Sequence, residues 1–461
     1  MNLKDILHNL PEIQGPTEKK LGFNVKLKWT IIILVAFFVL ANIPLYGLSE
    51  NNLSRFKYLA ILLGTEFGSI ISLGIGPIVM ASIILQLLVG AKILEIETST
   101  PEGKRYFQGL QKLLVFAFII FEAMVYVLMK GLTSNSILGI YGPIILIVQL
   151  CLGGLLIVFM DEVVHKWGFG SGVSLFIAAG VGWRLFASLF QFLGPEKTLE
   201  PSGKVLVLIS SLINSDPTGA TKALGAIIIT AIIFLVVVWA QSLKVEIPLS
   251  FDRMRGFGMR WPLQFFYASV IPVILVSALA ANLQLFASLI ENWVGHATFL
   301  GGFSAEGTPL SGISFWIHST PLLDAILTGS FRWVYLLQGL GHILFYTIFS
   351  ILFAFFWVNT SGMDAASQAK NIMKSGLQIP GFRKDERVLE SILKRYIAPL
   401  TIMGGAAIGL LASIADLLGA LIGGTSILLA VMILYQLYQN IAQQHALDMH
   451  PALKGVFGGN S

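Results

Sequence analysis

The chain is built around Phe56–Leu94, which reads FKYLAILLGTEFGSIISLGIGPIVMASIILQLLVGAKIL. This segment is too long for one ordinary membrane span and too interrupted for two. The Gly74-Ile75-Gly76-Pro77 sequence cannot continue a regular helix, because Pro77 donates no amide and crowds the preceding turn. Irregular backbone at membrane depth is tolerated only where it is buried in protein or lines a water-filled cavity. We therefore expect the segment to line a water-filled cavity.

Composition places the chain among polytopic α-helical membrane proteins. Of its 461 residues 55% are hydrophobic and 12% charged, and runs of about 20 apolar residues recur along it. A β-barrel would instead show short segments of alternating hydrophobicity. The single cysteine, Cys151, excludes an intramolecular disulfide.

The hydropathy pattern predicts an all-α fold of ten transmembrane helices. The expected spans are 29–48, 56–93, 106–130, 137–160, 171–193, 222–243, 262–287, 333–358, 397–415 and 425–443. An even number of spans puts both termini on one side. The N-terminal segment and the 244–260 and 359–396 loops hold five, four and seven Lys and Arg residues, whereas the 288–332 loop holds only Arg332. The positive-inside rule therefore predicts cytosolic termini.

Ten spans divide into two halves of five, and an odd number per half forces opposite orientations around a shared central pore. We expect a first half over 29–193 and a second half over 222–443, joined by an external linker at 194–221. Residues 1–28 form a cytosolic N-terminal segment in which Leu3, Ile6, Leu7 and Leu10 predict a short amphipathic surface helix. The second half carries cytosolic loops at 244–261 and 359–396, and a cytosolic tail follows at 444–461.

Motifs for nucleotide or metal chemistry are missing from the sequence. It contains no Walker A loop, no H-E-x-x-H and no C-x-x-C, so neither a cofactor nor a metal site is expected. The Gly168–Gly172 run is interpreted as the entry to the fifth span. The charges within spans are spread out and suggest no relay; they are Glu66, Lys112, Glu122 and Arg184.

Two further features are interpreted as packing. Gly405 and Gly409 form a G-x-x-x-G, which is typical of close helix contact. His342 is a lone histidine among apolar residues, so a hydrogen-bonded packing role is expected rather than catalysis.

Branched aliphatic residues are candidates for the cavity lining. Ile75 and Val79 are four residues apart, as are Val173 and Ile177, so each pair would share a helix face. Such side chains around a cavity form a constriction that blocks ions by dewetting. Spacing alone does not select these four, because branched aliphatics are common on lipid-facing surfaces.

Four long motifs resemble the SecY family, which provides the channel subunit of the protein translocon. They are LGIGPIVMASIILQLL (73–88), DEVVHKWGFGSGVSLFIAAG (161–180), FWVNTSGMDAASQAKNI (356–372) and GFRKDERVLESILKRYIAPLT (381–401). The resemblance covers nearly the whole chain and is closest to the archaeal and eukaryote-like branch. It implies a protein-conducting channel that passes unfolded polypeptides across the membrane and releases hydrophobic segments sideways into lipid.

The same resemblance implies roles for particular residues. A pore ring would comprise Ile75, Val79, Val173, Ile177, Ile274 and Leu429. A plug would run from Arg55 to Phe67, and it includes Tyr58, Leu62 and Glu66. A lateral gate would open between spans two and three on one side and spans seven and eight on the other, with Asn282 at a polar gate position and Met80 beside the gate. Arg255 and Arg383 match positions that contact the ribosome.

The implied partners are two small membrane subunits resembling SecE and SecG or Sec-beta, the ribosome or a separate motor, signal peptides and nascent chains, and the lipid bilayer. The implied location is the cell membrane, if the chain is archaeal. Two readings from other classes stay open. A secondary transporter would also have inverted repeats and broken helices but should show a polar site at the midplane. An integral membrane enzyme would need paired catalytic residues facing one cavity, and none is apparent.

Overall fold

The structure is a computed structural model, and it describes residues 10–17, 21–55, 60, 64–90, 93–94, 96, 100–192, 202–251, 258–304, 306–374, 377–378 and 385–449. Within this part of the chain, nine helices are long and apolar enough to cross a membrane. They are α2 (Phe23–Ala41), α5 (Pro101–Leu128), α6 (Tyr141–Trp167), α7 (Gly172–Phe190), α9 (Pro217–Ser242), α10 (Ile271–Val294), α13 (Trp333–Thr360), α15 (Glu386–Leu417) and α16 (Gly424–Met449).

The tenth span is the broken one, and its helix is α4 (Gly76–Gly90). Its 15 residues extend about 22 Å, less than the roughly 30 Å of a bilayer core. The helix begins where Pro77 predicted, since proline is tolerated only at a helix start, where no amide partner is needed. The ten-span all-α fold is thereby confirmed.

The remaining elements connect these helices. They are β1 (Leu48–Asn51), η1 (Asn52–Arg55), β2 (Leu132–Ser134), η2 (Ser136–Leu138), α8 (Lys204–Ile213), β3 (Lys244–Phe251), β4 (Gly258–Gln264), β5 (Gly302–Phe303), β6 (Pro309–Ser311), α11 (Gly312–Ile317), α12 (Leu322–Leu327), α14 (Ala365–Lys374) and β7 (Leu377–Gln378). Strands β1 and β2 form one antiparallel pair, and β5 and β6 another.

The backbone before α4 is a compact series of turns. Gly64, Gly68 and Gly74 adopt positive φ angles, which a β-carbon disfavours. Side chains of the same segment satisfy its polar groups: the Thr65 hydroxyl donates to the carbonyl of Ile71 at 2.6 Å. This is how non-helical backbone persists at membrane depth without unpaired polar groups.

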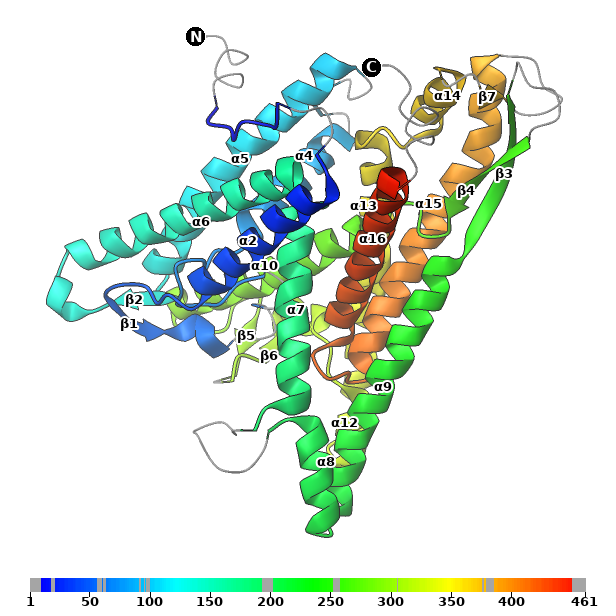
Figure 1. Ribbon diagram of the computed structural model, residues 1–461. Coiled ribbons are helices and arrows are strands. Elements are labelled where there is room, and N and C mark those ends of the chain that lie inside the picture. Colours follow the sequence, from blue (N-terminus) through cyan, green and yellow to red (C-terminus); the bar gives the residue numbers. More distant parts are fainter. Residues whose placement is uncertain are drawn as a thin grey trace.

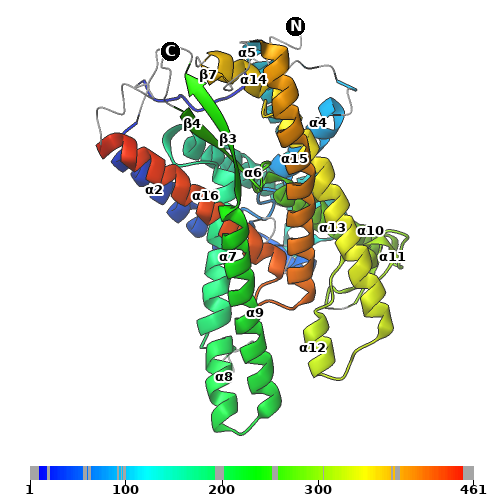
Figure 2. The ribbon, with the colours of Figure 1, turned by 90° about the vertical axis from the view of Figure 1, so that its right-hand side faces the viewer.

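The two large basic loops meet in one three-stranded sheet of order β4-β3-β7. Strands β3 and β4 form a hairpin, and Ser250 of β3 pairs with Gln378 of β7. Figure 1 shows this sheet and α14 at one end of the long helices, with α8 and α12 at the opposite end. The view turned by 90° agrees (Figure 2). The 359–396 loop contains α14 and the first turns of α15.

Several predicted span ends were wrong. The seventh span was expected at 262–287, but 262–264 belong to β4 and the helix starts at Ile271. The apolar run at 262–270 reads like a span, whereas Pro262 pairs with Glu246 in the hairpin and the chain then turns. Helix α15 begins at Glu386 instead of 397, because its first turns are amphipathic and hydropathy does not detect a helix that continues outside the membrane.

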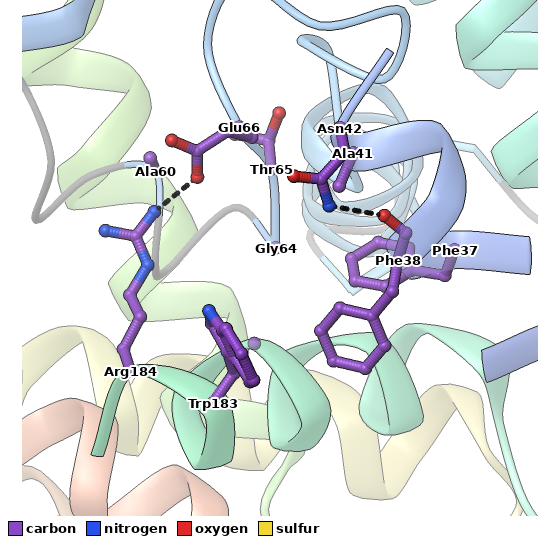
Figure 3. A pocket seen from close by; sticks show the side chains of 11 residues that line it. Phe37, Phe38, Ala41, Asn42, Ala60, Gly64, Thr65, Glu66, Trp183 and Arg184 are labelled. Carbon is purple, nitrogen blue, oxygen red and sulfur yellow. Dashed lines mark hydrogen bonds and ion pairs between the residues drawn. The ribbon is translucent and has the colours of Figure 1, made fainter. Parts of the chain in front are cut away.

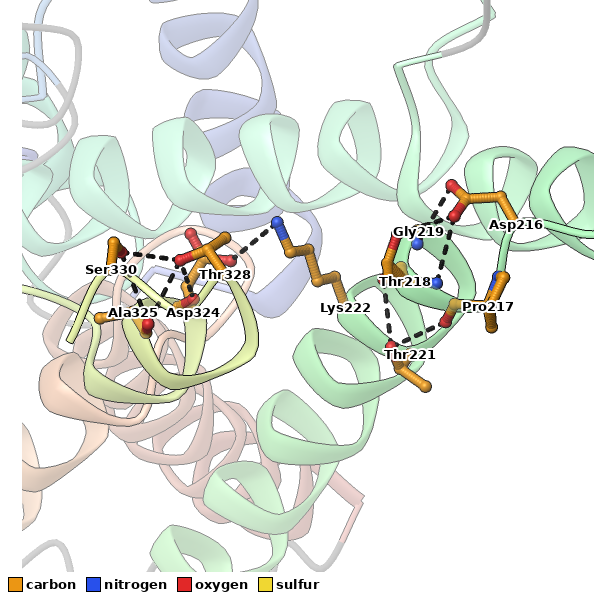
Figure 4. A network of polar contacts seen from close by, with 10 residues as sticks. All are labelled: Asp216, Pro217, Thr218, Gly219, Thr221, Lys222, Asp324, Ala325, Thr328 and Ser330. Carbon is orange, nitrogen blue, oxygen red and sulfur yellow. Dashed lines mark hydrogen bonds and ion pairs between the residues drawn. The ribbon is translucent and has the colours of Figure 1, made fainter.

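At the opposite end, α9 is fixed by polar contacts (Figure 4). Asp216 caps the helix by accepting from the amides of Thr218 and Gly219, each at 3.1 Å. The hydrogen bond from the Thr218 hydroxyl and those amides hold the pKa of the Asp216 carboxyl below its usual value. Lys222 of α9 lies 3.8 Å from Asp324 of α12.

The N-terminal segment lies against the end of α6. The indole of Trp167 donates to the carbonyl of Gln14 at 3.0 Å, and the amide of Ile13 donates to Glu162 at 3.0 Å. Glu162 also pairs with Lys112 of α5, so this charge within a span has a partner. The surface helix expected around residues 3–10 falls almost entirely outside the described residues.

Helices α13 and α15 approach closely through the predicted glycine pair. A β-carbon at Gly409 would lie 2.7 Å from the carbonyl oxygen of Tyr346 and 2.8 Å from Cα of Thr347. At Gly405 it would lie 3.1 Å from Cα of Ile351. Backbone atoms cannot move aside as a flexible side chain can, so Gly409 requires glycine, and Gly405 admits a β-carbon only if its neighbours shift by a few tenths of an ångström. The packing role predicted for the motif is confirmed.

Gly409→Ala is therefore expected to destabilise the folded chain by about 1–3 kcal/mol, because the added methyl overpacks a backbone contact. The matched control is Gly182→Ala in α7, where a β-carbon would meet nothing within 4 Å. That change should be neutral or stabilising by up to about 1 kcal/mol through helix propensity. Thermal unfolding of the purified protein in detergent measures both. Equal midpoints for the two variants would contradict the close-packing assignment.

Candidate pore, plug and gate

Five of the six candidate ring residues are buried in one apolar cluster, and the sixth, Val173, packs against it. The residues come from five parts of the chain: the turn before α4 (Ile75), then α4, α7, α10 and α16. Ile75 and Leu429 are 0% exposed and Ile177 is 1% exposed. All six side chains, which are up to 354 residues apart in sequence (75 to 429), therefore belong to the one apolar core that the long helices share.

The segment before α4 covers this cluster from one side. A β-carbon at Gly64 would lie 3.9 Å from Cγ2 of Ile75 and 3.9 Å from the backbone nitrogen of Ile177. Ala60, Thr65 and Phe67 are buried. Of the other plug residues expected from the sequence, Tyr58 and Leu62 lie outside the described residues. Arg55 ends the short helix η1, and its side chain also lies outside the described part.

An ion pair holds the end of the plug segment to α7. Arg184 donates from Nη2 to Oε2 of Glu66 at 2.9 Å, and the Glu66 side chain is 61% exposed. The pair borders a cavity of about 260 Å³ between α2, the plug segment and α7 (Figure 3). Phe38 of α2 faces Trp183 of α7 there, with ring centroids 6.2 Å apart. The exposed position of Glu66 agrees with a side chain that faces a water-filled cavity rather than lipid.

A seam runs between α4 and α5 on one side and α10 and α13 on the other. Phe121 of α5 meets Phe286 of α10 edge to face, with centroids 6.3 Å apart. Gly90 at the end of α4 packs on Phe356 of α13, where a β-carbon would lie 2.2 Å from Cδ1 of the ring. The seam is therefore closed by aromatic contacts.

Asn282 lies within α10 and is 1% exposed. Its Nδ2 donates to the carbonyl of Ala278 in the same helix at 2.9 Å. Its Oδ1 is buried and has no hydrogen-bond partner among the described residues. The only hydrogen bond of this side chain among the described residues is therefore within α10, and the amide oxygen is left without a partner.

Glu122 is a buried group whose position the sequence reading did not anticipate. It was noted only as one of several scattered charges, but the structure places it behind the first turn of α4. A β-carbon at Gly76 would lie 3.0 Å from Oε2 of Glu122. Both carboxylate oxygens, and the hydroxyl of Tyr126 one turn away, have no partner among the described residues. Carboxylates are rare within membrane spans, and this rarity is the sequence signal that could have singled out Glu122.

Arg255 and Arg383 lie outside the described residues, although the sheet that carries their loops is described. Arg260 of β4 donates to Glu246 of β3 at 3.1 Å. This hydrogen bond holds the pKa of Glu246 below its usual value. No group of three or more His, Cys, Asp or Glu side chains suited to a metal ion occurs in the described part of the chain.

Comparison with known proteins gives a consistent result. The family model described as SecY matches residues 69–438. Protein translocase subunit SecY of Methanothermobacter thermautotrophicus is 43% identical over 458 residues, covering 97% of each chain. A solved SecY structure, in which the plug domain is described as stabilising the closed state of the translocation channel and maintaining a membrane seal, is 37% identical with a TM-score of 0.81. The match covers 98% of this chain and 99% of the chain in that structure.

A second solved structure, Sec61 in the canine ribosome-channel complex from the endoplasmic reticulum, is 35% identical with a TM-score of 0.79, and the match covers 98% of this chain and 99% of that one. The family model spans well over half of the chain, and the similarity to the archaeal translocase subunit extends over nearly all of it. The chain belongs to the SecY family.

Proposed function

We propose that this chain is the central subunit of a protein-conducting channel, which passes unfolded polypeptides across a membrane and inserts hydrophobic segments laterally into the bilayer. The observation that carries the proposal is the burial of Ile75, Val79, Ile177, Ile274 and Leu429 in one apolar core, with Val173 packed against it and the turn at Gly64 beside Ile75 and Ile177. A pore for polypeptide must be wide when occupied and ion-tight when empty. Branched aliphatic side chains meet both demands because they yield to a peptide and are poorly wetted.

The other two classes of function have weaker support. A secondary transporter needs a polar binding site at the midplane, where this cluster is aliphatic. The similar proteins are named as a translocase subunit and as channels, so we infer a channel role without catalysis for this chain.

The chain is an integral, multi-pass membrane protein. We propose that the termini and the β4-β3-β7 sheet face the cytosol, on the basis of the lysine and arginine count, and that the membrane is the cell membrane if the source is archaeal. The proposed halves are 29–193 and 222–443, with an external linker at 194–221 and a cytosolic tail at 444–461. The partners we assign are the ribosome or a separate motor, SecE-like and SecG or Sec-beta-like subunits, signal peptides and nascent chains.

We assign Arg55–Phe67 as the plug and Asn282 as a lateral-gate residue. The plug assignment is supported by the contact of Gly64 with the aliphatic cluster and by the Glu66–Arg184 ion pair. The gate assignment is supported by the position of Asn282 within the helix that forms one side of the seam.

The ring is tested by replacing Ile177 and Leu429 together with Asn. The double variant should raise resting ion conductance several-fold, because polar side chains wet the constriction, while translocation of peptide is retained. Single-channel current in planar bilayers and peptide uptake by proteoliposomes measure the two activities. The matched control is Ile228→Asn, at an exposed position of α9 away from the cluster. A double variant as ion-tight as the parent would mean that the six residues do not line the pore.

The gate is tested with Asn282→Leu. Leucine removes the unpartnered amide oxygen from the seam and leaves an apolar surface, so the closed seam should become more stable by about 1 kcal/mol or more. A segment would then need greater hydrophobicity to enter the bilayer. Membrane insertion of a graded series of test helices measures this threshold. A threshold identical to that of the parent would show that Asn282 is not part of the gate.

Ribosome docking is tested by the double reversal Arg255→Glu with Arg383→Glu. Each arginine can make charge-assisted hydrogen bonds to phosphate worth about 1.5–3 kcal/mol, so affinity should fall about tenfold or more and depend less on salt. Co-sedimentation of ribosomes with proteoliposomes at two salt concentrations measures both effects. Arg332→Glu, in the loop assigned to the opposite side, is the charge-matched control. An unchanged affinity in the double reversal would remove the two residues from the docking surface.

A further inference from the structure

Two of the helices that carry candidate ring residues, α7 and α16, begin in the same way. Each starts with a glycine, Gly172 or Gly424, followed by a residue whose amide faces a carboxylate of the preceding long helix. The amide of Val173 donates to Oδ1 of Asp161 in α6 at 3.0 Å. The amide of Thr425 donates to Oδ1 of Asp416 in α15 at 2.8 Å. The two aspartates occupy equivalent places in the two halves, on the fourth and ninth spans.

Close contact at the glycine fixes each arrangement. A β-carbon at Gly172 would lie 2.6 Å from Cα of Asp161, and one at Gly424 would lie 2.1 Å from the carbonyl carbon of Ala415, the neighbour of Asp416. Neither helix start could approach its aspartate this closely with any larger residue. The carboxylate and the helix start are therefore held together by both packing and hydrogen bonding.

The aspartate carboxylates accept hydrogen bonds from amides at the helix starts. Ser171 stands at the N-cap of α7, but its side chain makes no capping hydrogen bond, so Asp161 takes this role from another helix. In the second half, Thr425 donates to Asp416 from its hydroxyl as well as from its amide. A negative charge is also favoured at a helix N-terminus by the helix dipole.

A residue of α13 also lies against Asp416. Nε2 of His342 lies 3.5 Å from Oδ2 of Asp416, and its Nδ1 faces the carbonyl oxygen of Ile317. Asp416 is 5% exposed and Thr425 is fully buried, so these contacts take place away from solvent. Hydrogen bonds to a charged group are strong in such surroundings, and they restrict where the helix start can lie.

Each capped amide lies one helical turn before a candidate ring residue. Ile177 follows Val173 by four residues, and Leu429 follows Thr425 by four. Residues at this spacing share a helix face, so the position of the first turn determines where the ring side chain points. The two helices run in opposite directions (Figure 1), so the caps act from opposite ends of the bundle.

We propose that Asp161 and Asp416 are positioning residues for the pore ring, each fixing the first turn of a ring-bearing helix through an interhelical carboxylate cap. The proposal rests on the ring assigned under the proposed function. Neither aspartate lines the pore; each acts through the backbone of Val173 or Thr425 on the side chain four residues further on.

The test measures resting ion conductance of the complete channel complex in planar bilayers. Asp161→Ala and Asp416→Ala should each raise conductance several-fold without substrate, because the freed helix start lets Ile177 or Leu429 leave the ring. Asp216→Ala is the matched control, since it removes a cap of the same chemistry from α9, which carries no ring residue. The control should conduct as the parent does.

A second measurement separates positioning from a general loss of stability. If Asp416 acts through Leu429, Asp416→Ala should raise the conductance of the parent chain. The same change should add little to the conductance of a chain that already carries Leu429→Asn. Additive increases in this pair would overturn the proposal. If an alanine variant fails to assemble, the asparagine variant at the same position replaces it, because asparagine keeps one acceptor oxygen. The asparagine variant should raise the resting ion conductance by a smaller amount. A conductance equal to that of the parent counts against the proposal.

The outcomes for the ring and for the caps are distinguishable. Ion-tight ring variants would overturn the ring and with it the role of the caps. Leaky ring variants combined with ion-tight Asp161→Ala and Asp416→Ala chains would leave the ring in place and overturn the positioning role alone.

Discussion

The interruption of the second span at Gly74–Pro77 is the constraint on which the rest of the structure depends. Because Pro77 cannot donate to the preceding turn, the chain cannot cross the membrane there as one helix. Its irregular part must be enclosed by protein, and Ile75 is indeed fully buried in the apolar core that the long helices share. Hydroxyls of Thr65 and Ser72 satisfy the turns locally. One proline thus requires both a short helix α4 and a surrounding wall.

Sequence was sufficient for features that repeat along the chain and insufficient for those that depend on distant partners. Hydropathy located ten spans, and the G-x-x-x-G motif identified close packing at Gly405 and Gly409, because both signals are local. Ile274 and Leu429 came only from the resemblance, since no spacing rule relates residues on different helices. The ion pair of Glu66 with Arg184 joins positions 118 residues apart, and periodicity does not reveal it. The start of α10 was misplaced because an apolar strand and an apolar helix have similar hydropathy.

Some buried polar groups have hydrogen-bond partners among the described residues, and others have none. Asp416 is fully engaged by Thr425, with His342 beside it, in the second half. Glu122, behind the first turn of α4, and the amide oxygen of Asn282 in α10 have no partner among the described residues. An unpartnered buried polar atom costs about 1–3 kcal/mol, so each of these two sites lowers the stability of the closed structure.

The sheet of β4, β3 and β7 has a mechanical consequence. Strand β4, at one edge of the sheet, is followed in the chain by α10, and β7, at the other edge, is followed by α15, which packs on α13 through Gly405 and Gly409. Helix α9 also runs into the sheet, because it ends at Ser242 and β3 begins at Lys244. A force that displaced the sheet would therefore be transmitted to these helices through the backbone, and it would reach the face of α10 and α13 that meets α4.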